Sequence, residues 1–284
     1  MKYLKLLRVK HYLKNVIVLF PLFFSRKFLD NSYWLSALLG FLAFCAISSA
    51  VYIFNDIRDI ENDRKHEYKQ FRPLASGAIK VSNAWGIFSI LLSGAISLQG
   101  LIQGSYIDGI LCILCYFIIN ICYSVGLKNI PIVDVSLLSL GYVIRLMYGS
   151  VIFDIPISAW LFLAILMISF YLSIGKREFE LEKSIRSKII TRKVLEFYSL
   201  EFLKLFKFVF LSLFLVFYSL WAVNDFVDIS VIGLFLVIVI CMRYEFTTQT
   251  IHLGDPIEVI FNDKLLCILG LIYSVFMGML LILG

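Results

Sequence analysis

The sequence predicts an all-α fold, a polytopic membrane bundle of nine transmembrane helices. Of its 284 residues, 61% are hydrophobic, and the mean hydropathy is +0.90. Soluble domains are only about 45–50% apolar. Apolar runs recur along the whole chain, and a helix needs roughly 20 such residues to cross a hydrocarbon core of about 30 Å. We therefore expect one integral-membrane domain that covers residues 1–284.

The expected spans follow the chain at about 15–24, 34–55, 82–101, 106–124, 132–152, 157–175, 204–223, 229–243 and 264–284. The first span is short and has Pro21 near its middle, unless its helix begins near Leu4. Because similar runs continue to the C-terminus, we do not expect the first run to be a cleaved signal peptide. Polar loops at 56–81, 124–134 and 176–201 separate several of the spans.

The lysines and arginines predict the orientation. With a cytoplasmic N-terminus, all but three of the 26 basic residues fall in the N-terminal tail or in cytoplasmic segments. The exceptions are Arg26, Lys27 and Arg145. The positive-inside rule therefore places the N-terminus and the loops 56–81, 124–134 and 176–201 on the cytoplasmic side. With nine spans, the C-terminus lies outside.

The six cysteines all lie in apolar runs, where small apolar packing residues are the ordinary explanation. Cys112 and Cys115 form one CxxC pair within an expected span. Without a second pair or a nearby histidine, this spacing does not predict a zinc site.

An acidic segment, 55–63, ends the second span. Asn55, Asp59 and Asp63 are spaced i, i+4 and i+8, so they share one face if the helix continues past the apolar run. Asp56 flanks that face. Carboxylates this close repel one another unless a cation lies among them. Oxygen ligands of this kind suit Mg²⁺, which commonly binds a few carboxylates together with substrate phosphates.

The alternative is a solvated helix end. In that interpretation, neighbouring bases neutralise the acids, namely Arg58, Arg64 and Lys65. Carboxylates, bases and aromatics nevertheless gather in the loops expected at one membrane face. Such a set could hold Mg²⁺, a diphosphate and its remaining phosphate oxygens, above an apolar bundle that accommodates a lipid chain. Any single loop base could instead be a solvated or headgroup-binding charge.

Arg145 lies about 14 residues into the fifth expected span, near 20 Å from its cytoplasmic end at about 1.5 Å per residue. An ionisable residue at such a depth is costly and by default indicates a functional site. The alternative is that it snorkels to the outer interface or pairs with Asp154. The sequence leaves both interpretations open.

The motif Asn55-Asp56-x-x-Asp59-x-x-x-Asp63 resembles the first aspartate-rich motif of the UbiA superfamily of intramembrane prenyltransferases. Further segments are similar to the branch that contains decaprenyl-phosphate phosphoribosyltransferase, and together they cover almost the whole chain. These segments are Arg8 to Asn15, Asn55 to His66, Phe71 to Gly77, Tyr123 to Lys128, Gly141 to Arg145, Gly175 to Leu181, Arg243-Tyr244 and Gly254 to Pro256.

One departure from the wider superfamily affects the expected substrates. Aromatic prenyltransferases of the superfamily usually carry a second aspartate motif, DxxxD, after the fourth span. In this sequence Asp134 is followed four positions later by Leu138. The incomplete second motif argues against prenyl transfer from a prenyl diphosphate. It fits a substrate pair in which a sugar carries the diphosphate and the lipid carries a monophosphate.

The resemblance implies an Mg²⁺-dependent transferase that moves phosphoribose from 5-phosphoribosyl 1-diphosphate to a polyprenyl phosphate and releases diphosphate. The resemblance assigns catalytic roles to Asp56, Asp59 and Asp63. It assigns metal ligation to Asn55, Asp59 and Asp63. The sugar-diphosphate set comprises Lys69, Arg72, Lys128, Asp134, Lys176 and Arg177. The lipid-phosphate set comprises Arg8, His11, Lys14 and Asn15. Because a phosphate monoester with a second pKa near 6 is mostly an anion at pH 7, no general base is required.

The same resemblance implies a multi-pass protein of the inner (plasma) membrane that acts in cell-envelope biogenesis, with its site facing the cytoplasm and no nucleic-acid partner. Prenyl transfer to an aromatic or other small acceptor is the alternative enzymatic function. A carrier or channel would show inverted repeats or polar residues along several spans, and the sequence shows neither. The polyprenyl length and the oligomeric state stay open, and an oligomer is compatible with the sequence.

Overall fold

A computed structural model describes residues 2–65, 69–102, 104, 106–188, 192–225, 230–251 and 253–283. All regular secondary structure within these ranges is helical, as the sequence predicts. Seven helices among the described residues are long and apolar enough to cross a membrane. They cover Asn31–Arg58, Val81–Gly100, Tyr106–Val125, Val133–Phe153, Ala159–Ser187, Ile232–Ile251 and Lys264–Ile282. The predicted count of nine spans and the predicted orientation are therefore not confirmed. His66, which belongs to one motif of the resemblance, lies outside the described residues.

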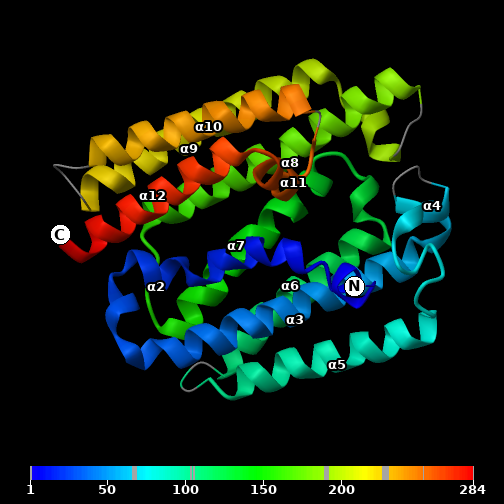
Figure 1. Ribbon diagram of the computed structural model, residues 1–284, viewed down its shortest axis with the longest axis horizontal. Coiled ribbons are helices and arrows are strands. Elements are labelled where there is room, and N and C mark those ends of the chain that lie inside the picture. The colour runs from blue at the N-terminus through cyan, green and yellow to red at the C-terminus, as the bar shows by residue number, and fades with distance from the viewer. Residues whose placement is uncertain are drawn as a thin grey trace. The chain divides into compact units, whose positions relative to one another are not determined.

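The chain divides into two compact units, and each is described by itself. The first comprises Met1–Leu127 and Ile144–Pro156. Its elements are α1 (Lys2–Leu7), η1 (Val9–Leu19), α2 (Phe20–Phe24), η2 (Lys27–Leu29), η3 (Asn31–Tyr33), α3 (Trp34–Arg58), α4 (Ile60–Arg64), η4 (Lys69–Phe71), α5 (Val81–Gly100), α6 (Tyr106–Val125) and the second half of α7 (Val133–Phe153). Helix α3 runs beside α5 (Figure 1). The buried aromatics Phe44, Tyr116 and Tyr148 lie at the centre of its core.

The second unit comprises Lys128–Val143 and Ile157–Gly284. Its elements are the first half of α7, then α8 (Ala159–Ser187), η6 (Lys193–Phe197), α9 (Leu200–Asp225), α10 (Ser230–Ile251), α11 (Pro256–Asn262) and α12 (Lys264–Leu283), while η5 (Leu127–Asn129) lies at the boundary of the units. Helices α8 and α9 pack side by side (Figure 1). Side chains cap several of these helices. The Ser158 hydroxyl accepts from the Leu161 N–H at 3.2 Å, the Asp255 carboxylate from the Ile257 N–H at 3.0 Å and the Asp263 carboxylate from the Leu265 N–H at 2.9 Å.

The first expected span differs from a single α-helix. Its residues form the 3₁₀ helix η1, followed by the short helix α2, in which Pro21 occupies the first turn. Gly149 of α7 explains part of this arrangement. A Cβ atom at Gly149 would lie 1.9 Å from the carbonyl oxygen of Val18, so the missing side chain lets the backbone of η1 contact α7. The narrower winding of a 3₁₀ helix suits this close approach.

The predicted loop 176–201 is also partly helical, because α8 continues through Ser187. Its polar end contains glutamate, lysine and arginine, which are good helix formers. Arg177 and Glu180 form an i, i+3 ion pair in this segment, with Nη1 and Oε2 2.5 Å apart. Lys176 and Arg177 are therefore positioned by a rigid helix and not by an irregular loop.

Candidate active site

The acidic motif lies where α3 ends and α4 begins. Asp59 separates the two helices with φ −95° and ψ 11°. Two backbone hydrogen bonds cross this point, from Asp59 N–H to Asn55 C=O at 2.9 Å and from Asp63 N–H to Asp59 C=O at 2.8 Å. Helical hydrogen bonding therefore continues past the apolar run, as the i, i+4, i+8 spacing predicts, although the helix is interrupted at Asp59.

Two arginines meet two aspartates of the motif in the first unit. Arg8 Nη2 forms an ion pair with Asp56 Oδ1. Arg72 Nη1 contacts both Asp56 Oδ1 at 3.1 Å and Asp63 Oδ2 at 2.7 Å. The two aspartates are only 2% and 4% exposed. We call these four residues the aspartate cluster. The two positive arginines balance the charge of the two aspartates, because buried carboxylates are stable only when they are paired.

Arg8 reaches the aspartate cluster through an unusual backbone conformation. Its φ of 52° and ψ of 47° lie in the left-handed region, which residues other than glycine seldom adopt. The turn separates α1 from η1, and the Arg8 guanidinium lies 4.7 Å from the ring centroid of Tyr52. The ion pair and this cation–π contact offset the energetic cost of the left-handed backbone conformation. Sequence reasoning assigned Arg8 to the lipid phosphate, whereas here it contacts the acidic motif.

Asn55 and Asp59 flank the aspartate cluster. The side-chain oxygen of Asn55 accepts a hydrogen bond from the hydroxyl of Ser124 at the end of α6. Arg58 donates to the carbonyl oxygen of Val125 at 2.8 Å. Ser124 was not among the residues expected from sequence, although it lies in a segment, 123–128, that carries the family resemblance. These contacts tie the end of α3 to the end of α6.

The aspartate cluster suits Mg²⁺ in its donor chemistry. Asp56 and Asp63 both touch one nitrogen of Arg72, so their oxygens are close enough to share a cation. No group of three or more His, Cys, Asp or Glu residues that could hold a metal occurs in the part of the chain that the structure describes. Mg²⁺ usually binds one or two carboxylates and completes its shell with water and substrate phosphates. Two convergent carboxylates therefore fit a metal that arrives with a diphosphate.

Asn15 is fully buried and lies at a polar junction within the first unit. Its amide nitrogen donates to Ser48 Oγ at 3.1 Å and Cys45 Sγ at 3.3 Å, and its oxygen accepts from Arg145 Nε at 2.8 Å. These contacts hold η1 against α3 and α7. Sequence reasoning assigned Asn15 to the lipid phosphate, whereas these contacts favour a positioning role.

Arg145 is buried, with 5% of its surface exposed. In addition to Asn15, it donates to the hydroxyl of Tyr116 at 3.0 Å and lies over the rings of Phe44 and Tyr116. Buried aromatic rings and polar oxygens can stabilise a guanidinium inside the membrane. These contacts place Arg145 inside the first unit. A side chain of Arg145 that snorkelled to the outer interface or paired with Asp154 would not make these contacts.

A second polar network lies within the second unit, at the start of α7. Asp134 and Arg177 are both fully buried, and the Arg177 guanidinium contacts one carboxylate oxygen of Asp134. The Tyr198 hydroxyl donates to the other oxygen at 2.6 Å and accepts from the Ile132 N–H at 2.7 Å. Burial, followed by the hydrogen bond to Asp134, raises the pKa of Tyr198, so its hydroxyl stays protonated.

The same network extends to the polar end of α8 and to the following loop. Glu180 Oε2 lies 2.5 Å from Arg177 Nη1 and 3.2 Å from Arg192 Nε. Asp134 and Arg177 were expected to bind the sugar diphosphate. In the structure they bind each other, together with Tyr198, which sequence reasoning missed because it lies 64 positions from Asp134 in the chain.

The remaining expected residues lie on several other elements or pair with other residues. Lys69 begins η4, and Lys128 lies in η5. Lys176 Nζ lies 3.6 Å from Asp255 Oδ2. His11 and Lys14 are part of η1, between the Arg8 and Asn15 contacts. The first unit thus brings together Asn55, Asp56, Asp63, Arg8 and Arg72, and the second brings together Asp134 and Arg177.

Comparison with known proteins assigns the family. A family model described as "UbiA prenyltransferase family" matches residues 18–245, which include the acidic motif and the second polar network. The chain belongs to the UbiA prenyltransferase family. Membership in this family and the apolar helices identify an integral membrane protein.

Two relatives in the UbiA prenyltransferase family match nearly the whole chain. A decaprenyl-phosphate phosphoribosyltransferase from Corynebacterium glutamicum is 31% identical over 94% of this chain and 83% of its own length. A protein of the same name from Mycolicibacterium smegmatis is 29% identical over 94% of this chain and 88% of its own. The similarity extends over the complete bundle and is not confined to the acidic motif.

Solved structures support the same fold. A UbiA homolog from Archaeoglobus fulgidus bound to GPP and Mg²⁺ matches with a TM-score of 0.73 over 100% of both chains, at 20% sequence identity. At this identity the match establishes the fold alone. The predicted UbiA-like helical architecture is therefore confirmed.

Proposed function

We propose that the protein transfers phosphoribose from 5-phosphoribosyl 1-diphosphate to a polyprenyl phosphate and releases diphosphate, in an Mg²⁺-dependent reaction. The main support is the pair of relatives that carry the name decaprenyl-phosphate phosphoribosyltransferase and align with 94% of this chain. The aspartate cluster adds chemical support, because it brings two carboxylates of the acidic motif together with two guanidinium groups.

The aspartate cluster can exchange its partners when the donor binds. Asp56 and Asp63 hold Arg8 and Arg72 in the structure. Mg²⁺, bound by Asp59 and Asp63 with Asn55 and Asp56 in support, would neutralise charge on the departing diphosphate. Arg72 would then turn from the carboxylates to the phosphate oxygens, for which a guanidinium is a strong bidentate donor. Each charged group would keep an opposite partner throughout this exchange.

The other candidate residues complete the two substrate sites. Lys69, Lys128 and Lys176 would contact the phosphates of the sugar donor. Asp134 and Arg177 would hold the start of α7 against α8 and so position Lys128 and Lys176. The lipid phosphate would bind near Arg8, His11 and Lys14, where η1 enters the apolar bundle, and its anionic oxygen would attack the sugar without a general base.

Asn15 and Arg145 would affect the lipid site indirectly, by fixing the position of the η1 backbone. The Arg145–Asn15 contact holds η1 against α7, and η1 begins immediately after Arg8. The bundle itself would accommodate the polyprenyl chain. We infer an inner-membrane location with the site on the cytoplasmic side, because the basic residues concentrate on the loops of that face. Such a lipid-linked pentose would serve cell-envelope biogenesis.

A direct test offers the purified protein a polyprenyl phosphate, Mg²⁺ and phosphoribosyl diphosphate that is radiolabelled in the ribose. Extraction into organic solvent should recover the label, and the recovery should disappear with EDTA. Prenyl transfer is the second candidate, because the structurally similar UbiA homolog was solved with GPP bound. Consumption of a prenyl diphosphate, with no ribose label in the organic phase, would favour that second function.

A further inference from the structure

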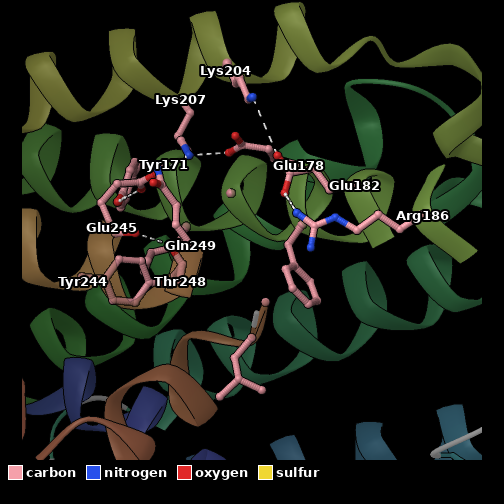
Figure 2. A pocket seen from close by; sticks show the side chains of 15 residues that line it. Tyr171, Glu178, Glu182, Arg186, Lys204, Lys207, Tyr244, Glu245, Thr248 and Gln249 are labelled. Atoms are coloured by element: carbon pink, nitrogen blue, oxygen red, sulfur yellow. Dashed lines mark hydrogen bonds and ion pairs between the residues drawn. The ribbon is translucent and has the colours of Figure 1, made fainter. Parts of the chain in front are cut away.

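The second unit contains a polar cavity of about 310 Å³. Small-molecule sites usually have volumes of about 300–1,000 Å³. Helices α8, α9 and α10 and the segment at Gly254 surround it (Figure 2). The polar residues that line it are Tyr171, Glu178, Glu182, Arg186, Lys204, Lys207, Tyr244, Glu245, Thr248 and Gln249. None of these residues belongs to the aspartate cluster or to the Asp134 network, so the proposed reaction gives this cavity no role.

The inner part of the cavity has an excess of negative charge. Lys207 is 6% exposed, and its ammonium group contacts the buried Glu178 and also Glu245 Oε1 at 2.7 Å. Glu245 further accepts from the Tyr171 hydroxyl at 2.9 Å and from the Gln249 amide at 3.0 Å. One ammonium group therefore serves two carboxylates, and the other two donors are uncharged. Because unbalanced charge is costly to bury, a second cation would be stabilised at this place.

The entrance of the cavity has the opposite excess. Lys204 Nζ lies 3.7 Å and Arg186 Nη2 lies 3.8 Å from oxygens of Glu182. The side chains of Lys204 and Arg186 are 50% and 61% exposed. Among the residues that line the entrance, two cations thus share one carboxylate, at distances longer than the about 2.7–2.9 Å of a charge-assisted hydrogen bond. An anionic phosphate would balance the entrance and approach these cations more closely than Glu182 does.

We propose that this cavity binds the headgroup of phosphatidylethanolamine, a zwitterionic phospholipid with a primary ammonium group. The phosphate contacts Lys204 and Arg186 at the entrance, and the ammonium contacts Glu178 and Glu245 inside. A positive entrance and a negative interior match the order of charges in this headgroup, because its phosphate lies nearer the acyl chains than its ammonium does. The inference goes beyond the proposed function and requires no step of the transfer reaction.

The charges of the cavity discriminate among phospholipid headgroups. Phosphatidylglycerol has the phosphate but no cation, so it would leave the interior negative. Phosphatidylcholine has a trimethylated ammonium, which has no N–H group to donate to Glu178 or Glu245. A primary ammonium has three donors, as a lysine side chain does. Of these three lipids, only phosphatidylethanolamine satisfies both ends of the cavity.

Exposed apolar side chains beside the entrance offer a surface for the acyl chains. Phe208 lies four positions after Lys204 on α9, so the two residues share a face of the helix. Phe208 and the neighbouring Leu205 are exposed, and so is Ile185, which directly precedes Arg186 on α8. A lipid whose phosphate contacts Lys204 can therefore cover these side chains. A soluble phosphate ester would leave them uncovered, which favours a phospholipid as the ligand.

The test measures lipid binding to the full-length protein in detergent by native mass spectrometry. Phosphatidylethanolamine, phosphatidylglycerol and phosphatidylcholine with identical acyl chains are titrated separately. We expect phosphatidylethanolamine to bind roughly tenfold more tightly than either of the others, the effect of one charge-assisted hydrogen bond. Equal affinities for the three lipids would overturn the proposal. Glycerophosphoethanolamine, which lacks acyl chains, is the fourth ligand, and binding as tight as that of the lipid would overturn the assignment to a phospholipid.

Two variants test the two ends of the cavity. Lys204→Gln should weaken phosphatidylethanolamine and phosphatidylglycerol alike by roughly tenfold, because both lipids carry the phosphate. Glu245→Gln should weaken phosphatidylethanolamine alone, because it removes a carboxylate that only the ammonium contacts. This variant still pairs Lys207 with Glu178, one cation with one anion, so the interior remains balanced. Lys193→Gln, at an exposed lysine outside the cavity, is the matched control and should bind like the wild type.

The pattern of selectivity separates recognition from folding. A general loss of structure would weaken both lipids in both variants, whereas the proposal predicts a loss for both lipids in Lys204→Gln and for one lipid in Glu245→Gln. The proposal is overturned if Lys204→Gln binds phosphatidylethanolamine as tightly as the wild type does. It is also overturned if Glu245→Gln keeps the full preference for phosphatidylethanolamine over phosphatidylglycerol.

Discussion

Arg72→Ala should make the stability of the protein depend on Mg²⁺. One nitrogen of Arg72 neutralises both Asp56 and Asp63, which lie 3.1 Å and 2.7 Å from it. Without Arg72, the two buried carboxylates keep only Arg8, which contacts Asp56 alone. Their mutual repulsion then opposes folding at neutral pH.

The expected loss follows from burial. Removing one partner of a buried ion pair costs about 3–5 kcal/mol. Arg72 is 28% exposed, so solvent screens part of this interaction, and we expect about 2 kcal/mol. Mg²⁺ should recover part of the loss by binding the folded state between the two carboxylates. In the wild type the same ion must displace Arg72, so its stabilising effect should be smaller.

Thermal unfolding in detergent, with and without Mg²⁺, measures both effects. Arg64→Ala is the control, because Arg64 pairs with the exposed Glu61 of its own helix α4 and donates from Nε to the Ala75 carbonyl oxygen at 3.2 Å. The exposed pair contributes only about 0–1 kcal/mol and the hydrogen bond about 0.5–1.5 kcal/mol, and neither loss leaves a carboxylate buried without a partner. The reasoning fails if Arg72→Ala melts no lower than Arg64→Ala, or if Mg²⁺ shifts the wild type and Arg72→Ala equally.

Three further predictions concern catalysis, packing and loop position. Asp63→Asn should lower phosphoribose transfer at least a hundredfold by removing charge at the leaving group, and it should lower the melting temperature because the buried pair with Arg72 is lost, so transfer is measured well below that temperature; near-normal turnover would exclude a catalytic role. Gly149→Ala should destabilise the protein by about 1–3 kcal/mol through overpacking, whereas Gly278→Ala, with no atom near its Cβ position, should not; equal melting temperatures would contradict the packing argument. Tyr198→Phe should remove one hydrogen bond to Asp134, cost roughly 1–3 kcal/mol and increase proteolysis near residue 198; an unchanged cleavage rate would show that the hydroxyl does not hold this loop.

The sequence was sufficient to predict the helical class, the family and the position of the acidic motif. Hydrophobic run length predicts membrane helices directly, and the spacing of Asn55, Asp59 and Asp63 predicts a shared helical face. The structure preserves the backbone hydrogen bonds that this spacing requires. The break at Asp59 was not predictable, because no proline or glycine marks it.

The partners of the acidic residues could not be predicted from spacing. Arg8 lies 48 positions before Asp56, and its approach depends on a left-handed backbone conformation. Asn15 and Arg145 are 130 positions apart and meet only because η1 packs against α7. The close approach of η1 to α7 likewise depends on Gly149, a tertiary contact that no local pattern indicates.

The contacts among the buried charges of the second unit could not be predicted from the sequence either. Glu178, Lys207 and Glu245 lie on three different helices, and each resembles an ordinary polar residue in its own segment. Only the packing of α8, α9 and α10 brings them to one cavity. Sequence periodicity places residues on one helix face, but it does not specify which faces meet.

Mass spectrometry of the lipid product tests the central claim most directly. The purified protein is incubated with Mg²⁺, a polyprenyl phosphate and phosphoribosyl diphosphate, and lipid and diphosphate are quantified together. The account predicts a lipid heavier by one phosphoribosyl unit, with one diphosphate released for each modified lipid, and no product from the Asp63→Asn variant. An unmodified polyprenyl phosphate under conditions in which the protein transfers a prenyl group to a small acceptor would contradict it.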